Sequence, residues 1–193
     1  MRRLCVFCGS KHGAQMAYTA AARKLGTVLA DRGIGLVYGG GDVGLMGEVA
    51  ESALGAGGEV VGVIPRFMVD REVANHAVTE LVVVESMHER KAEMTRRADA
   101  FLALPGGWGT LEELFEVTTW AQLGLHHKPV GILDVGGFFD PLVSFLDRAT
   151  DEGFIKPQHR RLLHVGADAS RLLDQLAEAA PAEGSKWDEG DKA

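Results

Sequence analysis

The stretch that decides the fold runs Ala100-Phe101-Leu102-Ala103-Leu104-Pro105-Gly106-Gly107-Trp108-Gly109-Thr110-Leu111-Glu112-Glu113. Its five leading apolar residues are typical of a strand covered on both faces, and Pro105 with the glycines after it interrupts regular structure. We expect the next helix to begin at Thr110. Backbone N–H groups at such a turn, together with the positive end of the helix dipole, favour a phosphate or carboxylate. The stretch therefore predicts a strand, an anion-binding turn and a helix.

Strands and helices are expected to alternate on both sides of this stretch. Apolar periodicity and glycine or proline breaks predict strands at 2–7, 34–38, 59–64, 81–84, 100–104, 128–133 and 162–165, and helices at 18–31, 46–56, 87–98, 111–123, 141–150 and 170–179. Residues 66–79 are irregular and leave room for one helical turn. Alternation implies parallel strands with right-handed crossovers. The predicted fold class is α/β, a doubly wound, Rossmann-like and mostly parallel sheet of about seven strands with helices on both faces.

Length, charge and hydropathy restrict the class of protein. A chain of 193 residues is expected to hold a single nucleotide-binding domain over 1–180, followed by a polar, disordered tail over 181–193. The formal net charge of −7 argues against nucleic acid or an anionic membrane as partner. No apolar run approaches the roughly 20 residues that span a bilayer, and no cleavage signal precedes the first strand. We therefore expect a cytoplasmic protein.

Four turns are expected to meet at one edge of the sheet. They follow the first, second, fourth and fifth strands at 8–10, 39–44, 85–90 and 105–110. Ligands of doubly wound sheets bind beyond the carboxyl ends of the strands, near the point where the strand order reverses. Candidate ligand contacts in these turns are Ser10, Gly41, Met87 and Gly106.

Gly39, Gly41 and Gly44 match the pattern Gly-x-Gly-x-x-Gly. The pattern alone is weak, because an NAD site also needs an acidic residue at the end of the next strand to hold the ribose. That strand ends at Ile64-Pro65-Arg66, without an acid. A mononucleotide or another phosphate ligand is favoured over NAD, and a purely structural tight turn stays open.

Charged residues near these turns each have a structural and a functional interpretation. Arg90 and Lys91 could lie on a solvated helix face paired with Glu93, or beside the cleft and bind a phosphate or carboxylate. Glu113 is spaced from Thr110 as in a capping box, which would stabilise the helix start by ~1 kcal/mol. It could equally be a carboxylate held behind the anion site. Both interpretations stay open here.

Cys5 and Cys8 form a Cys-x-x-Cys spacing, but on a strand they point to opposite faces, which favours buried thiols over a redox pair or metal site. The histidines lack ligand spacing, and no Gly-x-Ser-x-Gly elbow occurs. We propose no metal and no cofactor.

The run from Pro105 to Glu113 resembles the Pro-Gly-Gly-x-Gly-Thr-x-x-Glu signature of the LONELY GUY family of cytokinin-activating enzymes. Further segments resemble that family in order, namely Cys5-Val6-Phe7-Cys8-Gly9-Ser10, Tyr38-Gly39-Gly40-Gly41, Gly44-Leu45-Met46-Gly47, Gly62-Val63-Ile64-Pro65, Met87-His88-Glu89-Arg90-Lys91-Ala92-Glu93-Met94 and Thr119-Trp120-Ala121-Gln122-Leu123-Gly124. The resemblance covers residues from about 3 to 176. Members were long labelled lysine decarboxylases, but that reaction needs a pyridoxal phosphate Schiff base, for which no motif is present.

The resemblance implies a cytokinin riboside 5'-monophosphate phosphoribohydrolase, which hydrolyses the N-glycosidic bond of an N6-substituted AMP to a free base and ribose 5-phosphate. It also implies a homodimer with the active site at the subunit interface. It places the catalytic pair on Arg90 and Glu113. It places substrate contacts on Glu72, Lys91, Gly107, Trp108, Gly109, Thr110, Leu111, Glu112 and Thr119, with Glu113 at the end of that run. General purine nucleotide hydrolysis, and nucleotide binding without turnover, are the alternatives.

Overall fold

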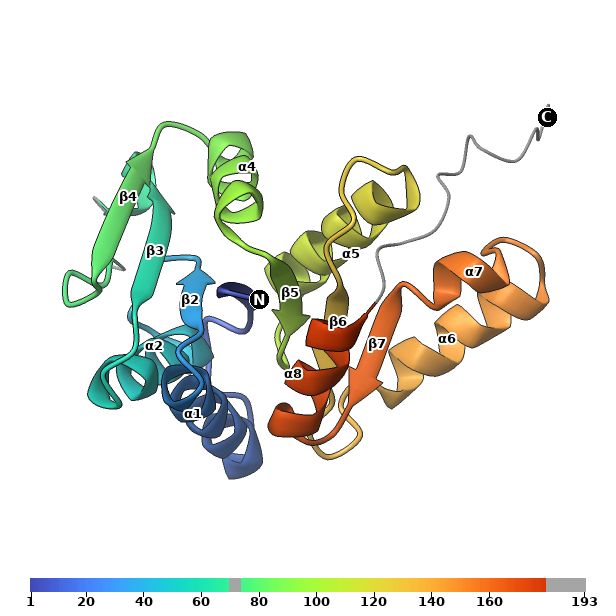
Figure 1. The fold of residues 1–193 in the computed structure, drawn as a ribbon, viewed down its shortest axis with the longest axis horizontal. Coiled ribbons are helices and arrows are strands. Elements are labelled where there is room, and N and C mark those ends of the chain that lie inside the picture. Colours follow the sequence, from blue (N-terminus) through green and yellow to red (C-terminus); the bar gives the residue numbers. More distant parts are fainter. Residues whose placement is uncertain (70–73, 180–193) are drawn as a thin grey trace.

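Seven parallel strands form one sheet in a computed structural model that describes residues 1–69 and 74–179 (Figure 1). The strands are β1 Arg3–Phe7, β2 Gly35–Tyr38, β3 Val60–Pro65, β4 Glu80–Val84, β5 Ala100–Ala103, β6 Val130–Leu133 and β7 Leu163–Gly166. Their order in the sheet is β4-β3-β2-β1-β5-β6-β7. The predicted doubly wound α/β class and its seven strands are confirmed, whereas the predicted tail over 181–193 lies outside the described residues.

Helices connect the strands as the alternation predicts. They are α1 Met16–Asp31, α2 Gly44–Gly55, α3 Arg66–Val69, α4 Met87–Arg97, α5 Trp108–Gln122, α6 Asp140–Asp151, α7 Pro157–Arg160 and α8 Ala169–Glu178. The single turn α3 is the one allowed for in 66–79. The four-residue α7 was not predicted, because so short a helix shows no periodicity. None of the described helices is long and apolar enough to cross a membrane.

Two apolar layers cover the two faces of the sheet. Alternate residues of β1 enter different layers, since successive strand side chains point to opposite faces. Cys8 packs with residues of α1, α2 and α8. Cys5 packs with residues of α4, α5 and α6. Both thiols are buried and free, which confirms the structural interpretation of the Cys-x-x-Cys spacing.

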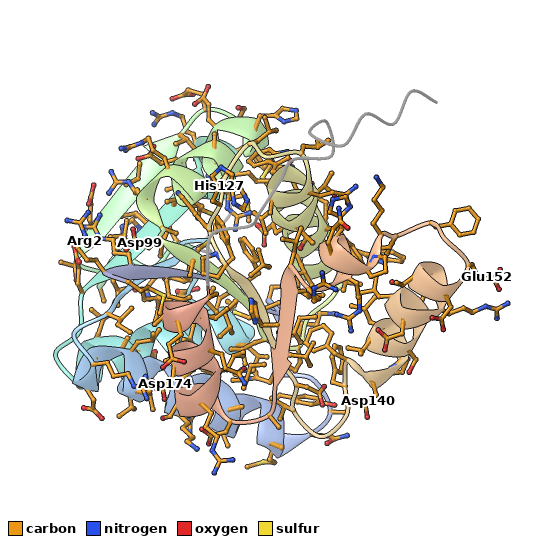
Figure 2. All side chains as sticks on the ribbon, turned by 45° about the vertical axis from the view of Figure 1, so that its right-hand side comes forward. Arg2, Asp99, His127, Asp140, Glu152 and Asp174 are labelled. Carbon is orange, nitrogen blue, oxygen red and sulfur yellow. The ribbon has the colours of Figure 1, made fainter. Side chains whose placement is uncertain are left out.

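The strand order reverses between β1 and β5. β1 pairs with β2 on one side and with β5 on the other, with Leu4 aligned to Ala100 in the second pair. At the amino ends of these strands, Asp99 accepts the backbone N–H groups of Arg2 at 2.6 Å and Arg3 at 3.0 Å (Figure 2). The carboxyl ends lie at the opposite edge, where sheets of this class bind their ligands.

Candidate active site

The turns after β1 and β5 are bonded to each other at the carboxyl edge. Gly9 donates its N–H to Pro105 O at 3.0 Å, and Leu45 at the start of α2 donates to Gly9 O at 3.0 Å. Gly106 must be glycine, because a Cβ there would overlap the Thr110 side chain and approach Gly9 N within 2.9 Å. These contacts place the glycine turn, the first turn of the chain and the start of α2 together, as predicted.

Helix α5 begins at Trp108, two residues earlier than predicted. Gly107 is the N-cap, and no side chain caps the helix. The predicted capping box between Thr110 and Glu113 is therefore wrong: a glycine N-cap costs little and places Thr110 inside the helix. The first N–H groups of α5 lack side-chain acceptors, and no acidic residue lies in the first turn. Such a helix start binds anions.

Glu113 and Arg90 form a buried ion pair between α5 and α4. Arg90 Nη1 lies 3.4 Å from Glu113 Oε1, and the two side chains are 9% and 11% exposed. Arg90 also donates to Val63 O at 3.1 Å and to Gly39 O at 3.3 Å. A Cβ at Gly39 would overlap the guanidinium, so this glycine makes room for Arg90. The solvated interpretation of Arg90 is therefore wrong, and the two predicted catalytic residues meet.

Burial raises the pKa of Glu113, although Arg90 opposes the rise. The neighbouring carboxylates of Glu112 and Glu116 raise this pKa further, and Lys91 lowers it. Burial disfavours the charged form of a carboxyl group, and a nearby cation favours it. Desolvation outweighs the opposing effect of Arg90 on this pKa. A carboxyl group with a pKa perturbed in this way is typical of a functional site.

Lys91 lies next to Arg90 on α4 and binds a different part of α5. Its Nζ lies 2.5 Å from Glu112 Oε1 and 2.9 Å from Glu116 Oε1. The expected pairing with Glu93 is wrong, because Glu93 binds Arg96 and Arg97 within its own helix. The start of α4 is as predicted: the Ser86 hydroxyl accepts the N–H of Glu89 at 3.1 Å.

A cavity of about 410 Å³ adjoins the start of α5. Predicted residues on its wall are Ser10, Gly106, Gly107 and Trp108; sequence reasoning missed Lys11, His12, Tyr18 and Phe138. Lys11 and His12 directly follow the predicted turn after the first strand, so their position in the sequence could have indicated them. Phe138 is brought to the cavity only by the tertiary structure. A second cavity of about 490 Å³ lies beside the start of α2. Lys11 and His12 line both cavities, but the second also carries Asp42, Glu48 and Glu51 on its wall, whereas the wall of the first has no acidic residue. The first cavity therefore suits an anionic ligand better.

The other predicted substrate contacts lie in different parts of the structure. Gly41 pairs with Ala74 in an isolated antiparallel bridge, and Met87 is partly exposed at the start of α4. Thr119 is exposed on α5, six residues and therefore about 9 Å along the helix from Glu113. The chain does not bring Thr119 to the glycine turn, and Glu72 lies outside the described residues.

Comparisons with known proteins identify the relatives of this chain. A protein-family model described as "Possible lysine decarboxylase" matches residues 46–176. The probable cytokinin riboside 5'-monophosphate phosphoribohydrolase LOGL5 of Oryza sativa subsp. japonica is 55% identical over 180 residues, 93% of this chain and 73% of that protein. The cytokinin riboside 5'-monophosphate phosphoribohydrolase LOG7 of Arabidopsis thaliana is 53% identical over 180 residues, 93% of this chain and 83% of that protein.

Among solved structures, the molybdenum cofactor carrier protein of Chlamydomonas reinhardtii superposes with a TM-score of 0.70. The superposition covers 92% of this chain and 98% of the carrier protein, at 24% sequence identity. At this identity the likeness shows the fold alone.

Proposed function

The chain belongs to the LONELY GUY family of phosphoribohydrolases, and from this premise we propose that it hydrolyses cytokinin riboside 5'-monophosphates. The bond broken is the N-glycosidic bond of an N6-substituted AMP. The products are the free cytokinin base and ribose 5-phosphate. Decarboxylation of lysine, which the family model's description names, is not the proposed reaction.

The observation that carries the proposal is the buried ion pair of Arg90 and Glu113 beside an uncapped helix start. Hydrolysis of a glycosidic bond passes through an oxocarbenium-like sugar, and a carboxylate near C1 stabilises this cation and positions water. We assign this role to Glu113. Two backbone carbonyls fix the position of Arg90, so that Arg90 can orient the Glu113 carboxylate. The positive charge of Arg90 favours the ionised form of Glu113.

The substrate phosphate is proposed to bind the first N–H groups of α5. Ser10, Gly106, Gly107 and Trp108 line the adjoining cavity, and Gly109 leaves open space at the helix start. Free helical N–H groups and the helix dipole both favour a dianionic phosphate there. The helix continues through Thr110, Leu111 and Glu112.

Activity is expected to have an acid limb set by Glu113. The carboxyl group must be ionised to stabilise a sugar cation, and burial raises its pKa above the ordinary value. Activity is therefore present above this pKa and is lost as the pH falls through it.

A product assay tests the proposal. The protein is incubated with N6-isopentenyl-AMP and, separately, with AMP, and free base and ribose 5-phosphate are measured. Release from the N6-substituted nucleotide is expected, and no release from either nucleotide would contradict hydrolysis. Preference for AMP would indicate general purine nucleotide hydrolysis, and tight binding with intact nucleotide would indicate a binding module.

Glu113→Gln is the matching variant, because it removes the charge and keeps the shape. We expect kcat to fall by about 100-fold or more. Glu152→Gln, an exposed change at the far end of α6, serves as control (Figure 2). Retained activity in Glu113→Gln would leave that glutamate a structural role only.

We further propose a cytoplasmic homodimer with its active sites at the subunit interface. In support, Phe115 and Leu125 expose apolar side chains on α5 and the turn that follows it. A second subunit would also bring the exposed Thr119 near a substrate. Sedimentation of the wild type and of Leu125→Asp tests this: the wild type is expected to sediment as a dimer, and the variant as a monomer with reduced activity. A monomeric, fully active wild type would contradict it.

A further inference from the structure

Tyr18, in the first turn of α1, is a polar side chain without a partner in the wall of the cavity that adjoins the start of α5. The residue is only 9% exposed. Within residues 1–69 and 74–179 its hydroxyl makes no hydrogen bond, and its oxygen is not enclosed, unlike that of Tyr38. Buried polar groups in proteins are normally hydrogen-bonded. The Tyr18 hydroxyl is therefore a free hydrogen-bonding group that is reached through the cavity.

The ring that carries this hydroxyl is held in place by its neighbours. Gly13 has a φ of +74°, and a Cβ there would approach the Tyr18 ring within 2.7 Å. The ring of Phe138 packs edge-on against Tyr18, with a centroid distance of 5.6 Å. The turn that presents Phe138 is fixed by Asp134, which accepts the N–H of Phe139 at 2.7 Å. A ligand would therefore meet a hydroxyl that is already in position, at little cost in conformational entropy.

The wall of this cavity favours an anionic ligand. The first N–H groups of α5 lack side-chain caps, Lys11 and His12 are basic, and the wall has no acidic residue. The volume of about 410 Å³ falls within the range of about 300–1,000 Å³ that is usual for ligand pockets. A tyrosine hydroxyl can donate or accept a hydrogen bond, but beside these donors and cations it meets an acceptor.

We infer that Tyr18 binds the 5'-phosphate of the substrate, with its hydroxyl donating a hydrogen bond to a phosphate oxygen that is held at the start of α5. The inference rests on the proposed hydrolase function, because this phosphate belongs to the nucleotide substrate and to the product ribose 5-phosphate. Tyr18 is a binding residue and not a catalytic one, since the phosphate takes no part in breaking the glycosidic bond.

Tyr18→Phe in the full chain tests the inference by titration calorimetry at fixed ionic strength. The ligands are ribose 5-phosphate and, as a probe of the phosphate group alone, inorganic phosphate. We expect Kd to rise by about 10- to 100-fold for both, because a hydrogen bond to a charged group is lost. KM for N6-isopentenyl-AMP should rise with little change in kcat, as for an interaction that binds substrate and transition state equally.

Stability and a second tyrosine separate this role from a structural one. Tyr18→Phe keeps the ring and its packing and removes a hydroxyl without an internal partner, so the urea midpoint should not change. The matched control is Tyr38→Phe, which removes the same group from a side chain that is 0% exposed. No ligand reaches that hydroxyl, and Kd for ribose 5-phosphate should stay at the wild-type value.

The two ligands give distinct ways to overturn the inference. An unchanged Kd for ribose 5-phosphate in Tyr18→Phe would overturn it. A rise for ribose 5-phosphate but not for inorganic phosphate would place the contact on the sugar and also overturn it, as would a wild type that does not bind ribose 5-phosphate. A wild type that binds ribose 5-phosphate through Tyr18 but releases no base from nucleotides would contradict the hydrolase alone.

Discussion

Replacement of Arg90 by methionine is expected to destabilise the protein in a pH-dependent way. The variant keeps an unbranched side chain of similar length but loses the guanidinium. Glu113, 11% exposed, then has no cation at 3.4 Å, and the carbonyls of Val63 and Gly39 lose their donor. Removing one partner of a buried ion pair costs about 3–5 kcal/mol. We expect a loss of this size in the free energy of unfolding at pH 8.

The loss should shrink as the solution becomes more acidic. Burial already raises the folded-state pKa of Glu113 above its unfolded value, and removal of Arg90 raises it further. A carboxyl group of this kind favours the folded state when protonated, and this stability is lost as the pH rises through the folded-state pKa. For each unit by which the folded-state pKa of Glu113 rises within the range from pH 5 to pH 8, the loss in the free energy of unfolding at pH 5 is smaller by about 1.4 kcal/mol.

Urea unfolding at fixed protein concentration, at pH 5 and pH 8, measures this difference. The double variant Arg90→Met/Glu113→Gln should be more stable than Arg90→Met at pH 8 by about 1–2 kcal/mol, because no buried charge is left unpaired. Arg148→Met, which loses an exposed pair with Glu152, should change little at either pH. An equal loss at both pH values, with no recovery in the double variant, would refute the argument that Arg90 compensates a buried carboxylate.

Three further changes follow from the packing. Gly39→Ala places a Cβ on the Arg90 guanidinium, and we expect a loss of about 1–3 kcal/mol in urea unfolding together with reduced kcat. Gly44→Ala combines a φ of +58° with overlap on the Lys11 backbone, so thermal unfolding should show a clear drop in Tm, and an unchanged Tm would contradict the strained turn. Trp108→Ala should leave the free energy of unfolding within about 0.5 kcal/mol, because the side chain is 90% exposed, while KM rises if the substrate contact is real.

Local patterns were sufficient for the elements and their order. Apolar runs between glycines predicted all seven strands, and α4 begins at residue 87 as predicted. The predicted ends of strands and helices were wrong where backbone hydrogen bonding sets them. The strand expected from Lys128 begins at Val130, because Pro129 has no N–H to add to the ladder.

The candidate site was predicted only in part. The glycine turns met at one edge because parallel strands end together, which the alternation of elements already implies. The role of Glu113 was undecided by its spacing, since the same interval serves a capping box and a residue inside a helix. The position of Gly107 as N-cap excludes the capping box.

The sequence by itself determined the sheet, the glycine-rich turn before α5 and the residue types of the site, because these depend on neighbours within a few positions. Only the tertiary structure decided which charges pair. Arg90 and Lys91 face residues more than twenty positions away, and their choice of Glu113, Glu112 and Glu116 over the nearby Glu93 depends on how α4 and α5 pack on the same face of the sheet. The pKa of Glu113 follows from this packing, because burial and its partners are properties of the folded chain.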